Sequence, residues 1–234
     1  MVGNNESSKK YVNIKKGLCE GFSIPVEVVE LDESLSDSEI QAKISSVCAD
    51  IGVGGVIIQL PLPRRSLDSL VDLIPTKKDV DCLSKESSKK FYSNDFSKLS
   101  PVVRAFKNYL EFSEINPKNI DTVIIGKGSL VGEPLGHFLL QQGAKVQFAL
   151  DYKTNFPINC HLLITSAGSP ALVKGESLPE GCNVVDFGSS VLDNKTIGDF
   201  DLKSTIGHLG FVSPSPGGMG PLVTRYLLMN FLGI

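Results

Sequence analysis

The sequence predicts an α/β protein with two domains, of which the second is a Rossmann-like, doubly wound parallel sheet. Helical and extended patterns alternate along most of the 234 residues, as in α/β folds. Residues 56–58 form an apolar run typical of parallel strands covered on both faces. Residues 84–100 are rich in Ser, Lys and Asp without clear periodicity and predict a loop or linker. We therefore expect an α/β domain over 1–101, the Rossmann-like domain over 102–214, and a closing helix over 215–234 that returns to the first domain.

In the first half of the chain, apolar periodicity predicts three helices and two strands. A helix is expected over 7–20, followed by a strand over 25–30. Ser or Asp caps begin a second helix over 36–49, and an apolar strand follows over 54–59. A short helix over 66–74 precedes the linker.

The second half repeats the alternation, as a doubly wound sheet requires. A helix over 102–113 leads into it, and Pro221 suits the first turn of a helix that runs through Leu228. The remaining elements are expected to be strands over 121–126, 145–150, 161–166 and 183–187, with a helix over 130–142.

Composition excludes several classes of protein. A hydrophobic content of 41% is enough for a real core, and a net charge of −3 gives no basic excess for nucleic acid or anionic membranes. Five cysteines without a C-x-x-C pair fit a reducing compartment. No apolar stretch reaches membrane-spanning length, and the first residues carry no secretion signal. We expect a soluble, cytoplasmic protein without a metal site, because the three histidines have no metal-binding spacing.

The carboxyl end of the strand over 54–59 is a candidate substrate site. Gln59 stands where Pro61 and Pro63 end the ladder, and Asp79 and Asp81 follow one loop later. Ligands of open α/β sheets bind at that end of the strands. The alternative is that Asp79 or Asp81 is a turn or cap residue.

Two residues of the first helix have a matching spacing. Tyr11 and Lys15 are four positions apart, so an aromatic ring and an amine share one helix face and can reach one ligand. The alternative is that Lys15 belongs to a solvated face together with its neighbouring lysines.

The strand over 121–126 is followed by a candidate dinucleotide site. Gly126, Gly128 and Gly132 form G-x-G-x-x-x-G at the start of a helix whose amides can hold a pyrophosphate. Asp151 ends the next strand, near the roughly 20-residue offset of the acid that meets a ribose 2′-hydroxyl. A carboxylate there would repel a 2′-phosphate, which favours NAD over NADP. The alternative is that the glycines serve strand–helix packing and Asp151 is a solvated loop acid.

Together these motifs resemble the bifunctional methylenetetrahydrofolate dehydrogenase/cyclohydrolase family of one-carbon metabolism, over nearly the whole chain. In chain order they are Ser8-Lys-Lys-Tyr11-x-x-x-Lys15, Gly55-Val-Ile-Ile-Gln59-Leu-Pro-Leu-Pro63, Lys78-Asp-Val-Asp81, Gly126-x-x-x-x-Val131-Gly-x-Pro134, Val185-Asp186-x-Gly188 and Pro214-x-Pro216-Gly-Gly-x-Gly220-Pro221.

The resemblance implies two reactions on tetrahydrofolate substrates: oxidation of the 5,10-methylene form with NADP or NAD, and hydrolysis of the methenyl form to 10-formyltetrahydrofolate. It implies that Lys15 is the catalytic lysine, that Gln59 hydrogen-bonds it, that Asp81 holds the pterin edge and that Tyr11 stacks near the folate ring. A neutral amide beside Lys15, rather than a carboxylate, would leave some of the amine able to act as a base on water.

The resemblance also assigns binding residues in the second half of the chain and a homodimer formed through the Rossmann-like domain. The turn formed by Pro216, Gly217 and Gly218 would approach the substrate, although it could equally be a mere helix-entry loop. The residues expected at the cofactor are Gly126, Lys127, Gly128, Asp151 and Ser189.

The chain departs from the family in three ways. The family carries another helix and a core strand before the Ser8 segment, so the first domain is expected to lack a central strand unless another segment fills the gap. The family's Pro-Cys-Thr-Pro-x-Gly element corresponds to the altered segment 101–106. At the cofactor, the family's usual residues are altered at Lys127–Gly128 and at 150–153, and Ser189 replaces an apolar residue. In the first domain, Cys82 replaces the glycine after Asp81.

Three alternatives to the bifunctional enzyme remain. Because most of these departures fall on the cofactor side, the chain could be a cyclohydrolase that has lost the dehydrogenase activity. It could also be a non-catalytic binding or regulatory subunit. A shikimate-type or amino-acid dehydrogenase of similar architecture would leave the Gln59 and Pro216 motifs without an explanation.

Overall fold

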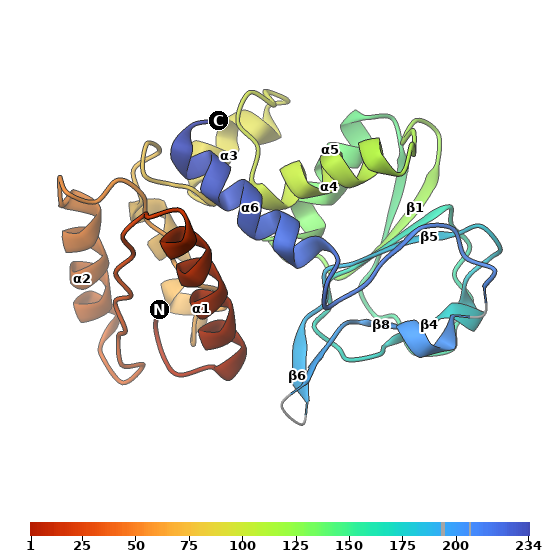
Figure 1. Ribbon diagram of the computed structural model, residues 1–234, viewed down its shortest axis with the longest axis horizontal. Helices are drawn as coiled ribbons and strands as arrows, with labels where there is room; N and C mark the ends of the chain where they lie inside the picture. The colour runs from red at the N-terminus through yellow and green to blue at the C-terminus, as the bar shows by residue number, and fades with distance from the viewer. Residues whose placement is uncertain (193–194, 206) are drawn as a thin grey trace. The chain divides into compact units, whose positions relative to one another are not determined.

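The computed structural model describes residues 1–192, 195–205 and 207–234 (Figure 1). The chain forms two compact units, one of residues 1–101 with 224–234 and the other of residues 102–223. The closing helix α6 (Met219–Leu232) starts in the second unit and ends in the first.

The first unit is built mainly from helices. Its elements are α1 (Glu6–Gly21), α2 (Asp37–Ala49), the 3-10 helix η1 (Arg65–Leu73), α3 (Lys85–Tyr92) and the end of α6. Side-chain caps explain where three of them begin: Asn5 caps α1, Ser36 and Glu39 form a capping box on α2, and Ser84 caps α3. The expected helices over 7–20 and 36–49 are confirmed as α1 and α2, and the expected helix over 66–74 is confirmed as η1.

Helix α3 corrects the expectation of a linker over 84–100. Its sequence is polar except at Phe91, so the periodicity is weak. Phe91 is nevertheless buried and packs its ring against those of Tyr92 and Phe96. One buried aromatic residue and the cap at Ser84 are enough to hold the helix within the first unit.

The two strands expected in the first unit do not form. Residues 25–30 and 54–59 are extended, but the only bridges they or their neighbours make, within the described residues, are Val2 with Leu31 and Val56 with Asp79, both parallel. A strand in a ladder has a hydrogen-bonded partner along its whole edge. Here only one residue in or beside each segment has such a partner.

The second unit contains a parallel sheet in the order β2-β1-β3-β5-β9. Its strands are β1 (Asp121–Ile125), β2 (Lys145–Ala149), β3 (Leu162–Thr165), β5 (Asn183–Asp186) and β9 (Val212–Ser213). Helices α4 (Pro101–Phe112) and α5 (Gly132–Gln141) belong to the same unit, with the short elements β4 (Val173–Lys174), η2 (Gly175–Ser177), β6 (Ser190–Leu192), β7 (Lys195–Ile197), β8 (Phe200–Asp201) and η3 (Leu202–Ser204).

The strands β1, β3 and β5 are buried on both faces, which is why each contains an apolar run, whereas β2 at the edge is partly exposed. Val123 and Ile125 of β1 pack in a cluster with Val184 and Phe200. Ile124 turns to the other face, towards Gly136 of α5. The predicted two-domain α/β fold with a doubly wound parallel sheet is confirmed. No helix among the described residues is both long and apolar enough to span a membrane.

Candidate functional site

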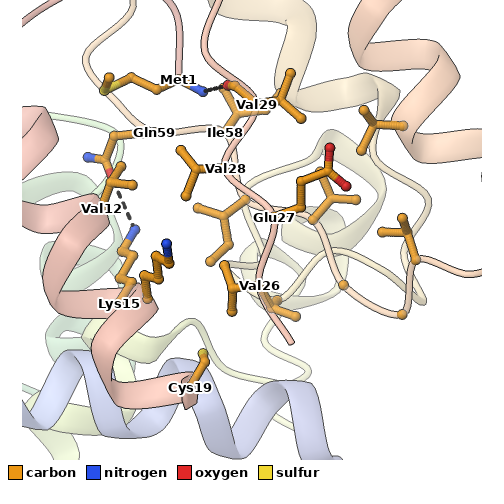
Figure 2. A pocket seen from close by; sticks show the side chains of 18 of the residues that line it. Met1, Val12, Lys15, Cys19, Val26, Glu27, Val28, Val29, Ile58 and Gln59 are labelled. Carbon is orange, nitrogen blue, oxygen red and sulfur yellow. Dashed lines mark hydrogen bonds between the residues drawn. The ribbon is translucent and has the colours of Figure 1, made fainter. Parts of the chain in front are cut away.

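Lys15 lies at the centre of a polar cluster in the first unit. Its Nζ donates to Oε1 of Gln59 at 3.2 Å (Figure 2) and is 3.9 Å from Oδ2 of Asp81. Gln59 is oriented by its own Nε2, which donates to the carbonyl of Leu60 at 2.7 Å. Tyr11 lies one turn before Lys15 on α1 and is half-buried. A helix, an extended segment and a loop thus place an amine, an amide and a carboxylate together.

The two aspartates of the loop have different roles. Asp79 is buried and accepts hydrogen bonds from the N–H groups of Leu83 and Ser84 at the start of α3. It therefore holds the turn that precedes α3, and a turn residue is one of the alternatives left open by the sequence. Asp81, two residues later, is the aspartate that faces Lys15.

The loop that carries Asp81 is anchored from several sides. Lys78 donates to the carbonyls of Cys48 and Asp50 at the end of α2. Asn230 of α6 donates to the carbonyls of Val80 and Leu99, both at 3.1 Å. Lys78 belongs to a motif visible in the sequence, but its partners and those of Asn230 do not follow from the sequence, because each contact joins residues far apart along the chain.

Cys82 stands directly after Asp81 with φ of +58°, in the left-handed region that favours glycine. The backbone thus keeps a conformation suited to glycine although the residue is a cysteine. The Cys82 side chain is buried. The direction in which Asp81 points is thus set by a turn that the substitution has not removed.

Burial raises the pKa of Asp81, the positive charge of Lys15 opposes this rise, and the nearby Asp79 adds to it. Asp81 therefore holds its proton more readily than an exposed aspartate. Its carboxyl group also corrects one expectation: the neighbours of Lys15 are not an amide alone but an amide and a carboxyl group.

A cavity of about 730 Å³ opens beside Lys15 and Gln59. It is lined by α1, α2, the end of α6 and the extended segments 24–29 and 52–59. Figure 2 shows Lys15 and Gln59 on one side of it and Val26, Val28 and Val29 on the other. Among the described residues, no group of three or more His, Cys, Asp or Glu side chains is arranged to hold a metal ion.

The second candidate site lies where the parallel strands of the second unit end. Residues 126–128 follow β1, Asp151 follows β2 and Ser189 follows β5, all at the carboxyl edge of one sheet. Asp151 is exposed and Ser189 is half-buried. Strand ends meeting at such an edge are where doubly wound sheets bind nucleotides.

The glycines after β1 serve different purposes. Gly126 has φ of +93°, and a Cβ there would come within 2.6 Å of the carbonyl oxygen of Ser166. A Cβ on Gly132 would collide with the carbonyl of Gly126, so this glycine permits strand–helix packing. Gly128 is exposed and a Cβ on it would meet no described atom within 4 Å. Packing therefore explains Gly126 and Gly132, whereas no packing contact explains Gly128 among the described residues.

Lys127 lies between these glycines and places its Nζ 5.1 Å from the centre of the Phe148 ring of β2. The contact has cation–π geometry. A cation and a carboxylate, Lys127 and Asp151, thus stand at the ends of neighbouring strands.

Two buried aspartates organise the loops at this edge. Asp186, at the end of β5, accepts from the Thr165 hydroxyl at 2.8 Å and from three backbone N–H groups, those of Gly188, Asp199 and Phe200. Asp199 accepts from the N–H groups of Ala167, Gly168 and Ser169. Burial raises the pKa of Asp186 to about 6 and also raises that of Asp199.

Asp186 belongs to a motif visible in the sequence, whereas Asp199 was missed. Nothing in its local sequence distinguishes Asp199 from a surface turn residue. Its function becomes visible only when three consecutive amides from another loop converge on it.

The turn formed by Pro216, Gly217 and Gly218 immediately precedes α6 and belongs to the second unit. Gly217 has φ of +99°, and Gly218 packs too closely against Pro214 to carry a side chain. The structure brings Lys15, Gln59 and Asp81 into contact with one another, and it places this turn and the cofactor residues in the other unit.

Comparison with known proteins shows which family this chain resembles. The family model described as "Tetrahydrofolate dehydrogenase/cyclohydrolase, catalytic domain" matches residues 1–81, and the one described as "Tetrahydrofolate dehydrogenase/cyclohydrolase, NAD(P)-binding domain" matches residues 101–234. The "Bifunctional protein FolD" of Staphylococcus saprophyticus is 31% identical, over 99% of this chain and 83% of its own length.

Two solved structures extend the likeness to the fold. The bifunctional FolD methylenetetrahydrofolate dehydrogenase/cyclohydrolase of Campylobacter jejuni is 31% identical and has a TM-score of 0.85, over 99% of this chain and 84% of its own. The FolD of Trypanosoma brucei, solved with NADP and an inhibitor, has a TM-score of 0.87 at 22% identity, over 99% of this chain and 83% of its own, which is a likeness of fold. The chain belongs to the tetrahydrofolate dehydrogenase/cyclohydrolase family.

Proposed function

We propose that this protein oxidises 5,10-methylenetetrahydrofolate to 5,10-methenyltetrahydrofolate with NAD(P) and hydrolyses the product to 10-formyltetrahydrofolate. The observation that carries the proposal is the contact of Lys15 with both Gln59 and Asp81 in a chain of this family. These three side chains come from separate segments and meet at Lys15, and Tyr11 lies one turn earlier on α1.

The proposed roles follow from the chemistry of each group. Lys15 takes the proton that water loses when it attacks the methenyl carbon. Gln59 holds the amine through its amide oxygen and has its own amide nitrogen fixed by Leu60. Asp81 accepts hydrogen bonds from the pterin edge, and Tyr11 stacks near the folate ring. The turn at Pro216, Gly217 and Gly218 contributes to the substrate site.

Residues at the carboxyl edge of the second sheet hold the cofactor in this proposal. Gly126, Lys127 and Gly128 receive its phosphates, and Asp151 and Ser189 line the ribose and nicotinamide sides. The dinucleotide, when bound, supplies the nicotinamide that accepts the hydride. The protein contributes mainly the positioning of the two carbon atoms. We propose NAD as the preferred cofactor because of Asp151.

The test measures the two reactions separately in Lys15→Met and in the matched variant Lys16→Met. Lys16 follows Lys15 on α1 but pairs with Glu20 instead of Gln59. We expect Lys15→Met to reduce methenyl hydrolysis at least 100-fold, and Lys16→Met to stay within about twofold of the parent. Full activity in Lys15→Met would refute the assignment of Lys15. Hydrolysis without NAD(P)-dependent oxidation in the parent would establish the cyclohydrolase alternative.

We also propose a homodimer formed through the second unit. Within the described residues β6 pairs only with β7, and its Val191 and Leu192 are exposed at 39% and 53%. An exposed apolar strand edge favours pairing with another strand. Sedimentation of the parent and of Leu192→Glu tests this, since the charge should shift the protein towards monomer. A parent that sediments as a monomer at every concentration would contradict the proposal.

A further inference from the structure

The second unit buries a pair of cysteines that the proposed function does not use. Cys160 lies just before β3 and Cys182 just before β5, and these two strands pair in parallel. The two Sγ atoms are 3.7 Å apart and share a hydrogen bond, and both residues are free cysteines. Cys160 is 4% exposed and Cys182 is 1% exposed. The other three cysteines of the chain, Cys19, Cys48 and Cys82, lie in the first unit.

The backbone beside the pair has the spacing that a disulfide requires. Leu162 and Asn183 are partners in the β3–β5 ladder, and the Asn183 N–H donates to the His161 carbonyl at 2.9 Å. Neighbouring residues on strands about 4.8 Å apart fall within the Cα–Cα range of about 4.4–6.8 Å that disulfides span. A disulfide places its sulfurs about 2.0 Å apart, so from 3.7 Å they have to approach by only about 1.7 Å. A bond between them would therefore leave the two strands paired.

The hydrogen bond between the thiols makes the two sulfurs chemically unequal. The Cys182 thiol donates to Cys160 and lowers the pKa of Cys160. Burial and, to a smaller extent, the charge of Asp121 oppose this fall in pKa, and a backbone hydrogen bond from Val123 adds to it. The same contact between the thiols, together with burial, raises the pKa of Cys182. Because the thiolate is the nucleophilic form of cysteine, Cys160 is the sulfur that attacks an oxidant, and Cys182 remains a thiol beside it.

A small surface hollow gives access to the pair. Its volume is about 150 Å³, and both cysteines line it together with their neighbours in 159–161 and 179–182 and with Asp121. Water takes up about 30 Å³ per molecule in the liquid, so the hollow admits a molecule as small as hydrogen peroxide. Asp121 and the exposed Glu180 give the lining an acidic character, which disfavours anionic oxidants. The site therefore suits a small, uncharged hydroperoxide.

We propose that Cys160 and Cys182 form a reversible disulfide when the protein meets a small hydroperoxide such as hydrogen peroxide. The Cys160 thiolate attacks one peroxide oxygen and the O–O bond breaks. Cys160 becomes a sulfenic acid, and the leaving hydroxide takes up the proton that Cys160 released. Cys182 then attacks the Cys160 sulfur while it loses its own proton, the S–O bond breaks, and a second water leaves. Each sulfur has lost one electron, and the peroxide has gained both.

The position of the bond indicates its effect. It would join the amino ends of β3 and β5, at the edge of the sheet opposite to the cofactor residues proposed above. It would also close a loop of chain over 160–182, which restricts the unfolded chain and so stabilises the second unit. In a reducing compartment such a bond is transient. The alternative is that two small thiols merely fill space in the apolar cluster with Leu163 and Val184, and it predicts no bond between them.

The experiment treats the reduced full chain with hydrogen peroxide, blocks the remaining thiols by alkylation and identifies linked peptides by mass spectrometry without reduction. The variants are Cys160→Ala and Cys182→Ala. Cys48→Ala is the matched control, because Cys48 is also buried but lies in the first unit. A reagent specific for sulfenic acids reports the first step. None of these readouts depends on turnover, so a negative result is distinguishable from failure of the proposed function.

We expect peroxide to raise the amount of the peptide that joins Cys160 to Cys182 by about tenfold in the parent and in Cys48→Ala, and dithiothreitol to remove it. Cys182→Ala should stop at the sulfenic acid on Cys160, whereas Cys160→Ala should leave Cys182 unlabelled. The urea midpoint of the parent should rise on oxidation and return on reduction. If an alanine variant fails to fold, the linked peptide and the urea shift of the parent still test the proposal.

Three outcomes would overturn the proposal. One is the absence of the linked peptide at peroxide concentrations that oxidise Cys19, which is less buried. Another is a sulfenic acid on Cys160 that persists in the parent as long as it does in Cys182→Ala, because Cys182 then does not attack it. The third is equal linkage of Cys160 to cysteines of the first unit, which would indicate exchange in an unfolded chain.

Discussion

Gly128 and Gly132 separate binding of the cofactor from stability of the fold, because one methyl group has opposite consequences at the two positions. In Gly132→Ala the new Cβ collides with the Gly126 carbonyl, a backbone group that cannot rotate away. Such overpacking costs about 1–3 kcal/mol, and the helix propensity of alanine recovers up to about 1 kcal/mol of it. In Gly128→Ala the Cβ meets no described atom within 4 Å, so the free energy of unfolding should stay within about 1 kcal/mol of the parent.

For binding of the cofactor we expect the opposite order, with the larger effect in Gly128→Ala. Where a phosphate group approaches the backbone at Gly128, a methyl group prevents the contact, and we expect the Kd for NAD(P) to rise at least tenfold, which is about 1.4 kcal/mol. Urea unfolding measures the free energy of unfolding of each variant. Calorimetric titration with the cofactor measures the Kd for NAD(P). If Gly128→Ala binds the cofactor as tightly as the parent, Gly128 is merely a loop glycine and the phosphate assignment fails.

Three further predictions concern single side chains. Asp151→Ser should raise turnover with NADP relative to NAD at least tenfold, since it removes the charge that repels a 2′-phosphate; equal turnover of the parent with both cofactors would contradict the assignment. Burial raises the pKa of Asp186 from an unfolded value of 3.8 to about 6, so its folded form keeps a proton that the unfolded chain releases. Stability from this group is present in full below pH 3.8 and is lost as the pH rises through 6. The free energy of unfolding should therefore increase as the pH falls from 7 to 5, with a slope of at most about 1.4 kcal/mol per pH unit, and Asp186→Asn, compared by urea titrations at several pH values, should flatten that slope. Asn230→Ala removes donors to the carbonyls of Val80 and Leu99 and should lower the free energy of unfolding by about 1–3 kcal/mol; no change in the urea midpoint would show that this anchor is dispensable.

Local signals predicted the helices well. The capping box at Ser36 and Glu39 and the periodicity of α1 and α5 act within a few residues, so the sequence carries them directly. Helix α3 was missed because a single buried residue, Phe91, gives no period to detect.

The strands show the opposite limit. Apolar runs at 121–126 and 54–59 look alike in the sequence, yet only the first becomes a strand. Its neighbours β2 and β3 lie on both sides of it, whereas the second has a partner for one residue. Strand formation depends on segments elsewhere in the chain, and a local pattern does not contain that information.

The candidate site combines both kinds of information. The spacing of Tyr11 and Lys15 on one helix is local, and Gln59 at the end of an apolar run before Pro61 is nearly so. The distinction between Asp79 and Asp81 is not local, because it depends on which aspartate accepts hydrogen bonds from the amides that precede α3. Once Asp79 is held by the amides of Leu83 and Ser84, Asp81 is left to face Lys15, and the left-handed turn at Cys82 directs the chain towards those amides. The contacts of Asp79 with the turn before α3 therefore decide which carboxyl group is left beside the lysine.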